Sequence, residues 1–134
     1  MADVIRMPIT SDSDLIEARQ KGRALAEQRG FASSELTLIA TAISELARNI
    51  IRYAKRGEIS IQIVESNPKE GIVIVAQDAG PGIADVERAL EAGYSTSGSL
   101  GLGLPGVRRI MDEFEVVSEV GRGTTVTVTK WKRR

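Results

Sequence analysis

The chain has 134 residues, with 18 lysines and arginines against 18 aspartates and glutamates, no histidine and no cysteine. This length favours one domain, spanning residues 1–134, around one hydrophobic core. The missing side chains exclude Ser-His-Asp and Cys-His catalysis, the usual zinc sites and autophosphorylation on histidine. A formal charge of zero offers no general attraction to nucleic acid or to an anionic membrane surface.

Apolar runs are short, and a run such as Ile72–Ala76 is far below the roughly 20 residues that cross a bilayer. The N-terminal stretch has charged residues among its apolar ones, unlike the continuous apolar core of a secretory signal. With no disulfide available, we expect a cytoplasmic protein that binds neither nucleic acid nor a membrane. A solvated tail is predicted for the C-terminal basic cluster of Lys130, Lys132, Arg133 and Arg134.

The first half of the chain predicts one strand and two helices. Val4–Ile9 is expected to form a short strand and about Asp12–Gln28 a helix, which the glycine that follows would end. The next helix has the clearest period, because apolar residues recur every three and four positions: Leu36, Ile39, Ala40, Ile43, Leu46, Ala47 and Ile50. Ser33 or Ser34 is expected to cap this helix, which should end before Gly57.

The second half predicts two antiparallel hairpins. Glu58–Glu65 alternates apolar and polar residues, Ile72–Ala76 is a β-branched run, and Asn67–Gly71 between them has turn chemistry. Glu115–Val120 and Thr124–Lys130 are the strands of the second hairpin, joined by a Gly-Arg-Gly turn.

Helices are predicted between the hairpins, near Ile83–Glu91 and around Leu104–Glu113, on either side of the Gly/Ser/Thr segment Gly93–Gly103. This succession predicts an α/β two-layer sandwich of the α+β type. Its sheet would be mixed but largely antiparallel, with helices covering one face.

Glycine is concentrated in one part of the chain, since seven of the 13 glycines fall between Gly80 and Gly106. The segment Gly101–Gly106 fits the G-x-G-x-x-G pattern of dinucleotide sites, yet no strand directly precedes it, which excludes a Rossmann site. A glycine-rich loop that leads into a helix still offers free N–H groups to a phosphate. A flexible surface loop is the alternative interpretation.

Two further clusters could carry chemistry. Glu45 and Asn49 are four residues apart on the long helix, so they share one face at the rim of its apolar stripe. The amide oxygen suits Mg²⁺ and the carboxylate could take a proton, although a polar pair on a solvated helix face has the same pattern. The stretch Asp78–Gly82 is either a simple turn or a site where the carboxylate of Asp78 accepts from an exocyclic amine such as that of adenine.

Together these motifs resemble those of the GHKL family of ATP-binding domains, which includes gyrase, Hsp90, MutL and the histidine kinases. In chain order they are Glu45–Asn49 (ELARN), Asp78–Gly82 (DAGPG), Gly101–Leu104 (GLGL) and Gly121–Thr124 (GRGT). Within the family, the chain is most similar to the short bacterial serine-protein kinases of partner-switching modules, and especially to their switch-protein kinases. The resemblance implies the Bergerat ATP-binding fold.

On this resemblance, Glu45 would be the general base toward the acceptor serine, and Asn49 would ligate the Mg²⁺ that bridges the phosphates of ATP. Asp78 would hold adenine, with Thr124 nearby through water. About residues 84–99 would form a lid. Further nucleotide contacts are expected at a set of mostly small and polar residues: Gly80, Gly82, Ser95, Thr96, Ser97, Gly101, Leu102, Gly103 and Leu104.

The implied activity is phosphorylation of a serine or threonine on a STAS-domain antagonist protein, with ATP and Mg²⁺. The resemblance also implies that the chain binds and activates a PP2C-type phosphatase as its alternative partner. Two other functions remain open, an anti-sigma factor kinase that sequesters a sigma factor and a non-catalytic nucleotide-sensing module. Arg48 is either a contact for phosphate or a surface charge.

Overall fold

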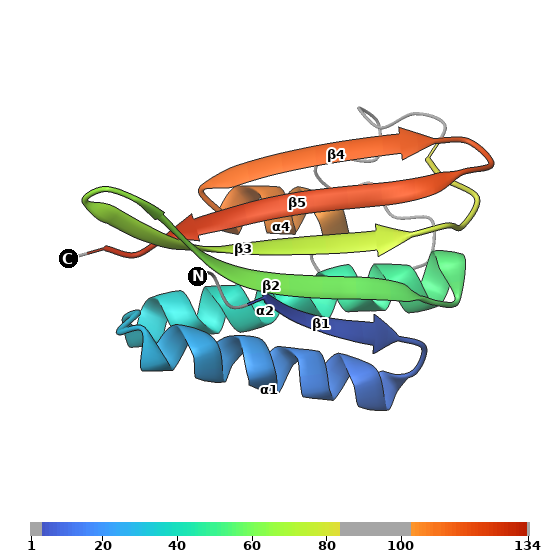
Figure 1. Ribbon diagram of the computed structural model, residues 1–134. Coiled ribbons are helices and arrows are strands. Elements are labelled where there is room, and N and C mark those ends of the chain that lie inside the picture. The colour runs from blue at the N-terminus through green and yellow to red at the C-terminus, as the bar shows by residue number, and fades with distance from the viewer. Residues whose placement is uncertain (1–3, 84–102, 134) are drawn as a thin grey trace.

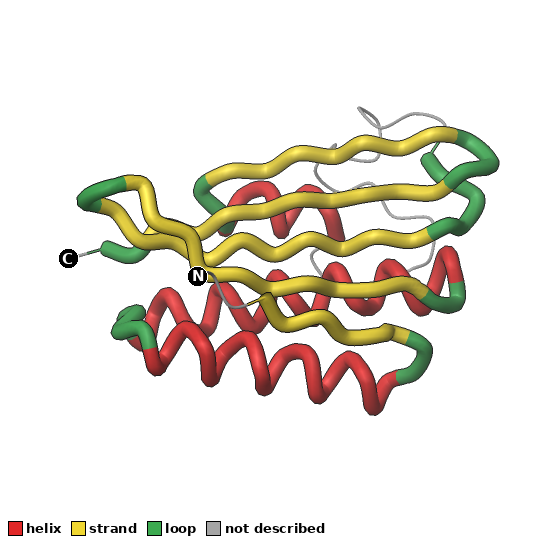
Figure 2. The backbone as a smooth tube through the Cα atoms, viewed as in Figure 1, coloured by secondary structure: helices red, strands yellow, loops and turns green. Residues whose placement is uncertain are grey.

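A computed structural model describes residues 4–83 and 103–133, which form two layers (Figure 1). The elements follow in the order β1 (Val4–Ile9), α1 (Asp12–Gln28), α2 (Ser33–Asn49), the π-helical turn η1 (Ile50–Ala54), β2 (Gly57–Ser66), β3 (Lys69–Asp78), α4 (Gly103–Ile110), β4 (Glu113–Glu119) and β5 (Gly123–Trp131). The strands make one layer, and the helices cover one face of it (Figure 2). The predicted two-layer α+β architecture is confirmed.

The described strands form one sheet in the order β1-β2-β3-β5-β4. All four pairings are antiparallel, so the mixed sheet predicted from the sequence is antiparallel throughout its described part. The first hairpin is tighter than expected, because strand pairing continues to Ser66 and Lys69 and leaves only Asn67 and Pro68 in the turn. β3 lies at the centre of the sheet, with β2 on one side and β5 on the other.

α1 has the predicted bounds and α2 ends before Gly57 as predicted, but the start of α2 differs. α1 begins as the sequence indicates, with the Ser11 side chain accepting from the N–H of Asp14. α2 begins after Ala32, and neither Ser33 nor Ser34 is its cap. Glu35 takes over instead, because its carboxylate accepts from the Ala32 N–H at 2.8 Å. No helix in the described ranges is long and apolar enough to cross a membrane.

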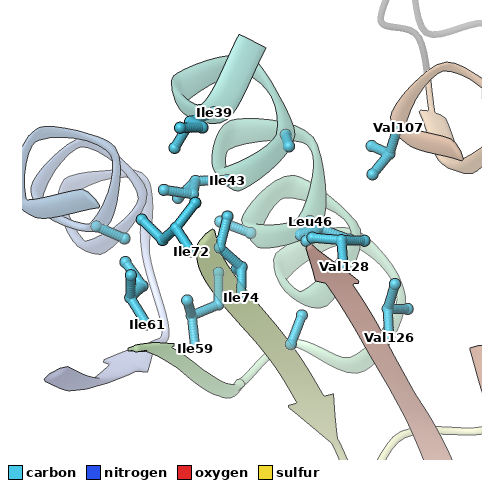
Figure 3. Packing of buried hydrophobic residues seen from close by; sticks show 14 of the residues in the cluster. Ile39, Ile43, Leu46, Ile59, Ile61, Ile72, Ile74, Val107, Val126 and Val128 are labelled. Carbon is cyan, nitrogen blue, oxygen red and sulfur yellow. The ribbon is translucent and has the colours of Figure 1, made fainter. Parts of the chain in front are cut away.

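The core lies between α2 and the inner face of the sheet (Figure 3). All seven residues of the predicted α2 stripe are buried. They meet inward-facing residues of the central strands: Ile59, Ile61, Ile72, Ile74, Val126 and Val128. α1 approaches α2 so closely that a Cβ on Gly22 would lie 2.2 Å from Cδ1 of Ile43. This core fixes α2 in rotation, and thereby places the polar side chains that flank its apolar stripe.

α4 ends earlier than predicted. The sequence pattern carries it to Glu113, whereas the helix ends at Ile110 and Glu113 begins β4. The stop comes from β5, where the buried Lys130 donates from Nζ to the carbonyl oxygen of Ile110 at 2.8 Å. Asp112 adds a backbone hydrogen bond to β5, so the chain turns into a strand there. The helix predicted near Ile83–Glu91 falls outside the described residues, apart from its first residue.

The prediction of a solvated C-terminal tail is wrong for Lys130 and Lys132, whereas the side chain of Arg133 is exposed and only its backbone is held. Lys130 is 5% exposed. Lys132 donates from Nζ to the carbonyl oxygen of Arg29 at 2.9 Å, and the backbone N–H of Arg133 donates to Glu35 at 2.9 Å. The end of the chain is therefore tied to the connection between α1 and α2, which also keeps Glu35 in place at the start of α2.

Candidate functional site

Glu45 lies where α2 meets α4, and the residue is only 8% exposed. Its Oε1 accepts a hydrogen bond of 3.2 Å from the backbone N–H of Gly103, the first residue of α4. Its Oε2 lies 2.7 Å from Nη1 of Arg48, one turn further along α2. The predicted general base is thus a carboxylate at the rim of the core, held by donors from two elements.

Asn49 is the last residue of α2 and is half-buried. The four-residue spacing puts it on the same face as Glu45, about 6 Å further along the helix axis. Its side chain makes no capping hydrogen bond to η1. The amide is therefore not used to start that turn. The described residues contain no group of three or more acidic side chains that could hold a metal by themselves. One amide oxygen fits Mg²⁺ that keeps waters and phosphate oxygens in its shell.

Asp78 is the last residue of the central strand β3 and is half-buried. The sheet places it opposite Gly57 of β2 and Thr124 of β5. Its Oδ1 accepts from the N–H of Gly80 at 2.9 Å, which closes the turn after the strand. The predicted proximity of Asp78 and Thr124 is therefore present.

Gly57 and Gly123 lie very close to the backbone at the end of β3. The sequence alone did not indicate this packing role for either glycine. A Cβ on Gly123 would lie 2.0 Å from the carbonyl oxygen of Asp78, and one on Gly57 would lie 2.4 Å from that of Gln77. Any larger residue at either position would push the neighbouring strand away from Asp78. Both glycines therefore allow the close strand pairing at the end of β3, where Asp78 lies.

Gly80 and Gly82, both expected nucleotide contacts, also have a packing role in the turn after Asp78. A Cβ on Gly80 would lie 2.6 Å from Cβ of Ala54, and one on Gly82 would lie 2.3 Å from the carbonyl oxygen of Glu119. Gly82 also has a positive φ of 78°. The absence of side chains at these positions lets the turn pack against η1 and the β4–β5 hairpin.

Ser118 is a residue that sequence reasoning missed. Its hydroxyl lies 2.8 Å from Oγ1 of Thr124, its partner in the β4–β5 pairing, and accepts from the N–H of Ile83 at 2.7 Å. This links the segment after Asp78 to the hairpin that carries Thr124. The available signal was the register of the hairpin, which places Ser118 opposite Thr124.

The glycine-rich segment is described only at its end. Ser95, Thr96, Ser97, Gly101 and Leu102 lie outside the described residues. Gly103 has a positive φ of 63° and donates to Glu45. Leu104 belongs to the hydrophobic core and is 8% exposed. Core packing alone therefore explains a leucine at this position.

The π-helical turn η1 connects the two halves of the site. It continues α2 directly after Asn49, and its last residue, Ala54, lies against Gly80 in the turn that follows Asp78. A proton acceptor and an oxygen ligand therefore lie on α2, and a second carboxylate lies where η1 meets the end of β3. This arrangement places an acceptor for an amine at one end and, at the other, a proton acceptor beside an amide oxygen that suits a divalent cation.

Comparison with known proteins agrees with this geometry. The profile of the histidine kinase-like ATPase domain matches residues 9–130. The serine/threonine-protein kinase RsbT of Bacillus subtilis (strain 168) is 48% identical over 133 residues, which cover 99% of this chain and 100% of that protein. The anti-sigma F factor of Caldanaerobacter subterraneus subsp. tengcongensis is 35% identical over 118 residues, covering 85% of this chain and 82% of that factor.

A solved structure shares the fold at low sequence identity. The RsbU and RsbW domains of a Mycobacterium tuberculosis protein superpose with a TM-score of 0.64 at 19% identity, covering 100% of this chain and 33% of that one. The sequence matches and the shared fold lead to one conclusion. The chain belongs to the family of histidine kinase-like ATPase domains, and within it to the serine/threonine-protein kinases that the Bacillus subtilis relative represents.

Proposed function

We propose that this protein kinase transfers phosphate from ATP to a serine or threonine of a STAS-domain antagonist, and that it binds and activates a PP2C-type phosphatase when it leaves the antagonist. The observation that carries the proposal is the placement of Glu45, a nearly buried carboxylate at the α2–α4 contact with Asn49 one turn away on the same face. The similarity to a serine/threonine-protein kinase and to anti-sigma factors supports a role in protein switching.

The residues supply positioning and proton transfer, which are the main needs of phosphoryl transfer. The acceptor oxygen bonds to the γ-phosphorus, its proton passes to a carboxylate oxygen of Glu45, and the bond to the bridging oxygen breaks with its electron pair leaving on ADP. Asp78 accepts from the adenine amine. Asn49 would hold Mg²⁺, which supplies charge neutralisation at the phosphates when it is bound.

The test is phosphate transfer from labelled ATP to purified STAS-domain proteins of the same organism, with magnesium present. The wild-type protein should label one of them on serine or threonine. Glu45→Gln should lower the rate by a factor on the order of 100 or more, because the amide cannot accept the proton. The matched control is Glu17→Gln, which changes an exposed glutamate of α1. Absence of labelling by the wild type across all such proteins contradicts the proposal.

A second candidate, sequestration of a sigma factor, is favoured by the 35% identity to anti-sigma F factors. The two functions predict different stable complexes. Binding of purified sigma factors and of PP2C-type phosphatases to the ADP-loaded and ATP-loaded protein separates them. A complex with a sigma factor and none with a phosphatase favours the second candidate.

A further inference from the structure

The carboxylate of Glu45 is held from two directions, and one of its two donors has no role in the function proposed above. Arg48 lies 2.7 Å from Oε2, while the N–H of Gly103 donates to Oε1 at 3.2 Å. The side chain of Glu45 is 10% exposed and that of Arg48 is 41% exposed. Arg48 therefore reaches inward from the surface to a carboxylate that solvent scarcely reaches.

Two donors on different oxygens fix both the position and the rotation of a carboxylate. Each oxygen has two lone pairs, so one remains on each after these bonds are made. Among the residues that the structure describes, only the longer bond to Gly103 would orient the Glu45 side chain without Arg48. The hydrogen bond from Gly103 thus joins Glu45 to α4, and the contact with Arg48 sets the rotation of the carboxylate.

We propose that Arg48 is a positioning residue, which holds the Glu45 carboxylate against the first N–H of α4 and leaves a free lone pair for the acceptor proton. The proposal rests on the role of Glu45 in the function proposed above, and it assigns Arg48 no contact with substrate. It explains why a basic residue three positions after the base has a buried partner. The expected cost of losing the alignment is in the rate of transfer, since misplacement of a catalytic group lowers rate more than binding.

A contact between Arg48 and phosphate is the alternative, and it predicts a different result. A phosphate ligand lost from the site weakens nucleotide binding, whereas a lost positioning residue leaves binding unchanged and slows the chemical step. The exchange of the Gly103 amide hydrogen reports the alignment separately. This amide should exchange faster when the carboxylate that accepts from it is free to turn.

The experiment compares the wild type with Arg48→Met, Arg48→Lys and the Arg48→Met/Glu45→Gln double variant. Arg23→Met is the matched control, since Arg23 is an exposed arginine of α1. We measure the single-turnover rate of phosphate transfer, the Kd of ATP and the exchange of the Gly103 amide by NMR. Arg48→Met should slow transfer on the order of 10- to 100-fold, and its Kd should stay within about twofold of the wild type.

Three further results complete the expected pattern. Arg48→Lys should recover part of the rate, the double variant should be no slower than Glu45→Gln alone, and exchange at Gly103 should be several-fold faster in Arg48→Met. An unchanged rate, a parallel loss of ATP affinity, or an equal loss in Arg23→Met overturns the proposal. If the wild type transfers no phosphate, the proposed function fails. Exchange of the Gly103 amide then tests the positioning role of Arg48 by itself. Unchanged exchange in Arg48→Met contradicts that role, and faster exchange supports it.

Discussion

Asp78 and Asn49 differ in how far the fold depends on them. Oδ1 of Asp78 closes a turn through the N–H of Gly80, whereas the side chain of Asn49 caps nothing in η1. Removing the amide of Asn49 should therefore have little effect on the free energy of unfolding. A substitution of Asp78 has to keep an oxygen toward Gly80, which makes asparagine the informative replacement there.

Asn49→Ala tests the expected magnesium ligand. We expect the free energy of unfolding to stay within about 0.5 kcal/mol of the wild type. We also expect the variant to lose most of the gain in ATP affinity that Mg²⁺ gives, because the metal loses its protein oxygen. Titration calorimetry with magnesium and with EDTA measures that gain, and Gln20→Ala in the exposed part of α1 is the control. An equal gain in the variant and the wild type would rule out Asn49 as the ligand.

The individual site residues could be predicted where a local pattern places them. Glu45 and Asn49 follow from helical spacing, and Asp78 follows from its position after an apolar strand. The bond between Glu45 and Gly103 joins residues 58 positions apart, so no local pattern contains it. The contact of Ser118 with Thr124 is more local, and it depends on the exact register of the predicted hairpin, which the strand pattern alone does not give.

Among the elements, α4 is held at both of its ends. Its first N–H donates to Glu45 of α2, and its last carbonyl accepts from Lys130 of β5. Between these contacts, Val107 is fully buried against the core. The start of this helix is therefore placed relative to the base by contacts that lie outside the helix itself.

Lys130→Met tests the contact at the C-terminal end of α4. Methionine fills similar space but leaves the carbonyl of Ile110 without its donor, so we expect a loss of about 1–3 kcal/mol in the free energy of unfolding. Urea denaturation measures it. The control is Lys21→Met, which removes an exposed i,i+4 ion pair with Glu17 and should change stability by less than about 0.5 kcal/mol. Equal stabilities of the two variants would contradict the assigned role of Lys130.

Element types and order could be predicted from the sequence, and some boundaries could not. Apolar periodicity placed the body of α2, and the glycine after Gln28 marked the end of α1. The end of α4 depends on Lys130, and the start of α2 depends on Glu35, which the backbone of Arg133 holds from the other end of the chain. Such boundaries are decided by tertiary contacts, which short sequence windows do not contain.

Across the whole molecule, the end of the chain connects the sheet layer to the helical layer. Glu70 of β3 pairs with Arg29 at the end of α1 and with Lys132 beyond β5. The Arg29 hydrogen bond, with added attraction from Lys132, holds the pKa of Glu70 below its ordinary value of 4.5. This cluster joins three segments that are distant in sequence.

The cluster predicts how stability depends on pH. Because the pKa of Glu70 is lower in the folded chain, the folded state binds fewer protons, and the stability that Glu70 contributes is complete above about pH 4.5. It is lost as the pH falls through the lowered folded value. Urea denaturation should therefore give a shallower acid-side decline for Glu70→Gln than for the wild type. Part of the decline should remain, since Asp14 also has a lowered pKa. Identical slopes would contradict this assignment.

The nucleotide site itself is best tested by titrating ATP with magnesium into the wild-type protein and into Asp78→Asn. Asparagine keeps an oxygen for Gly80 but puts an N–H₂ donor opposite the donor amine of adenine. We expect the wild type to bind ATP and the folded variant to bind it about 100-fold more weakly or worse. Equal affinities, or no binding by the folded wild type, would contradict a site in which Asp78 recognises the adenine of ATP.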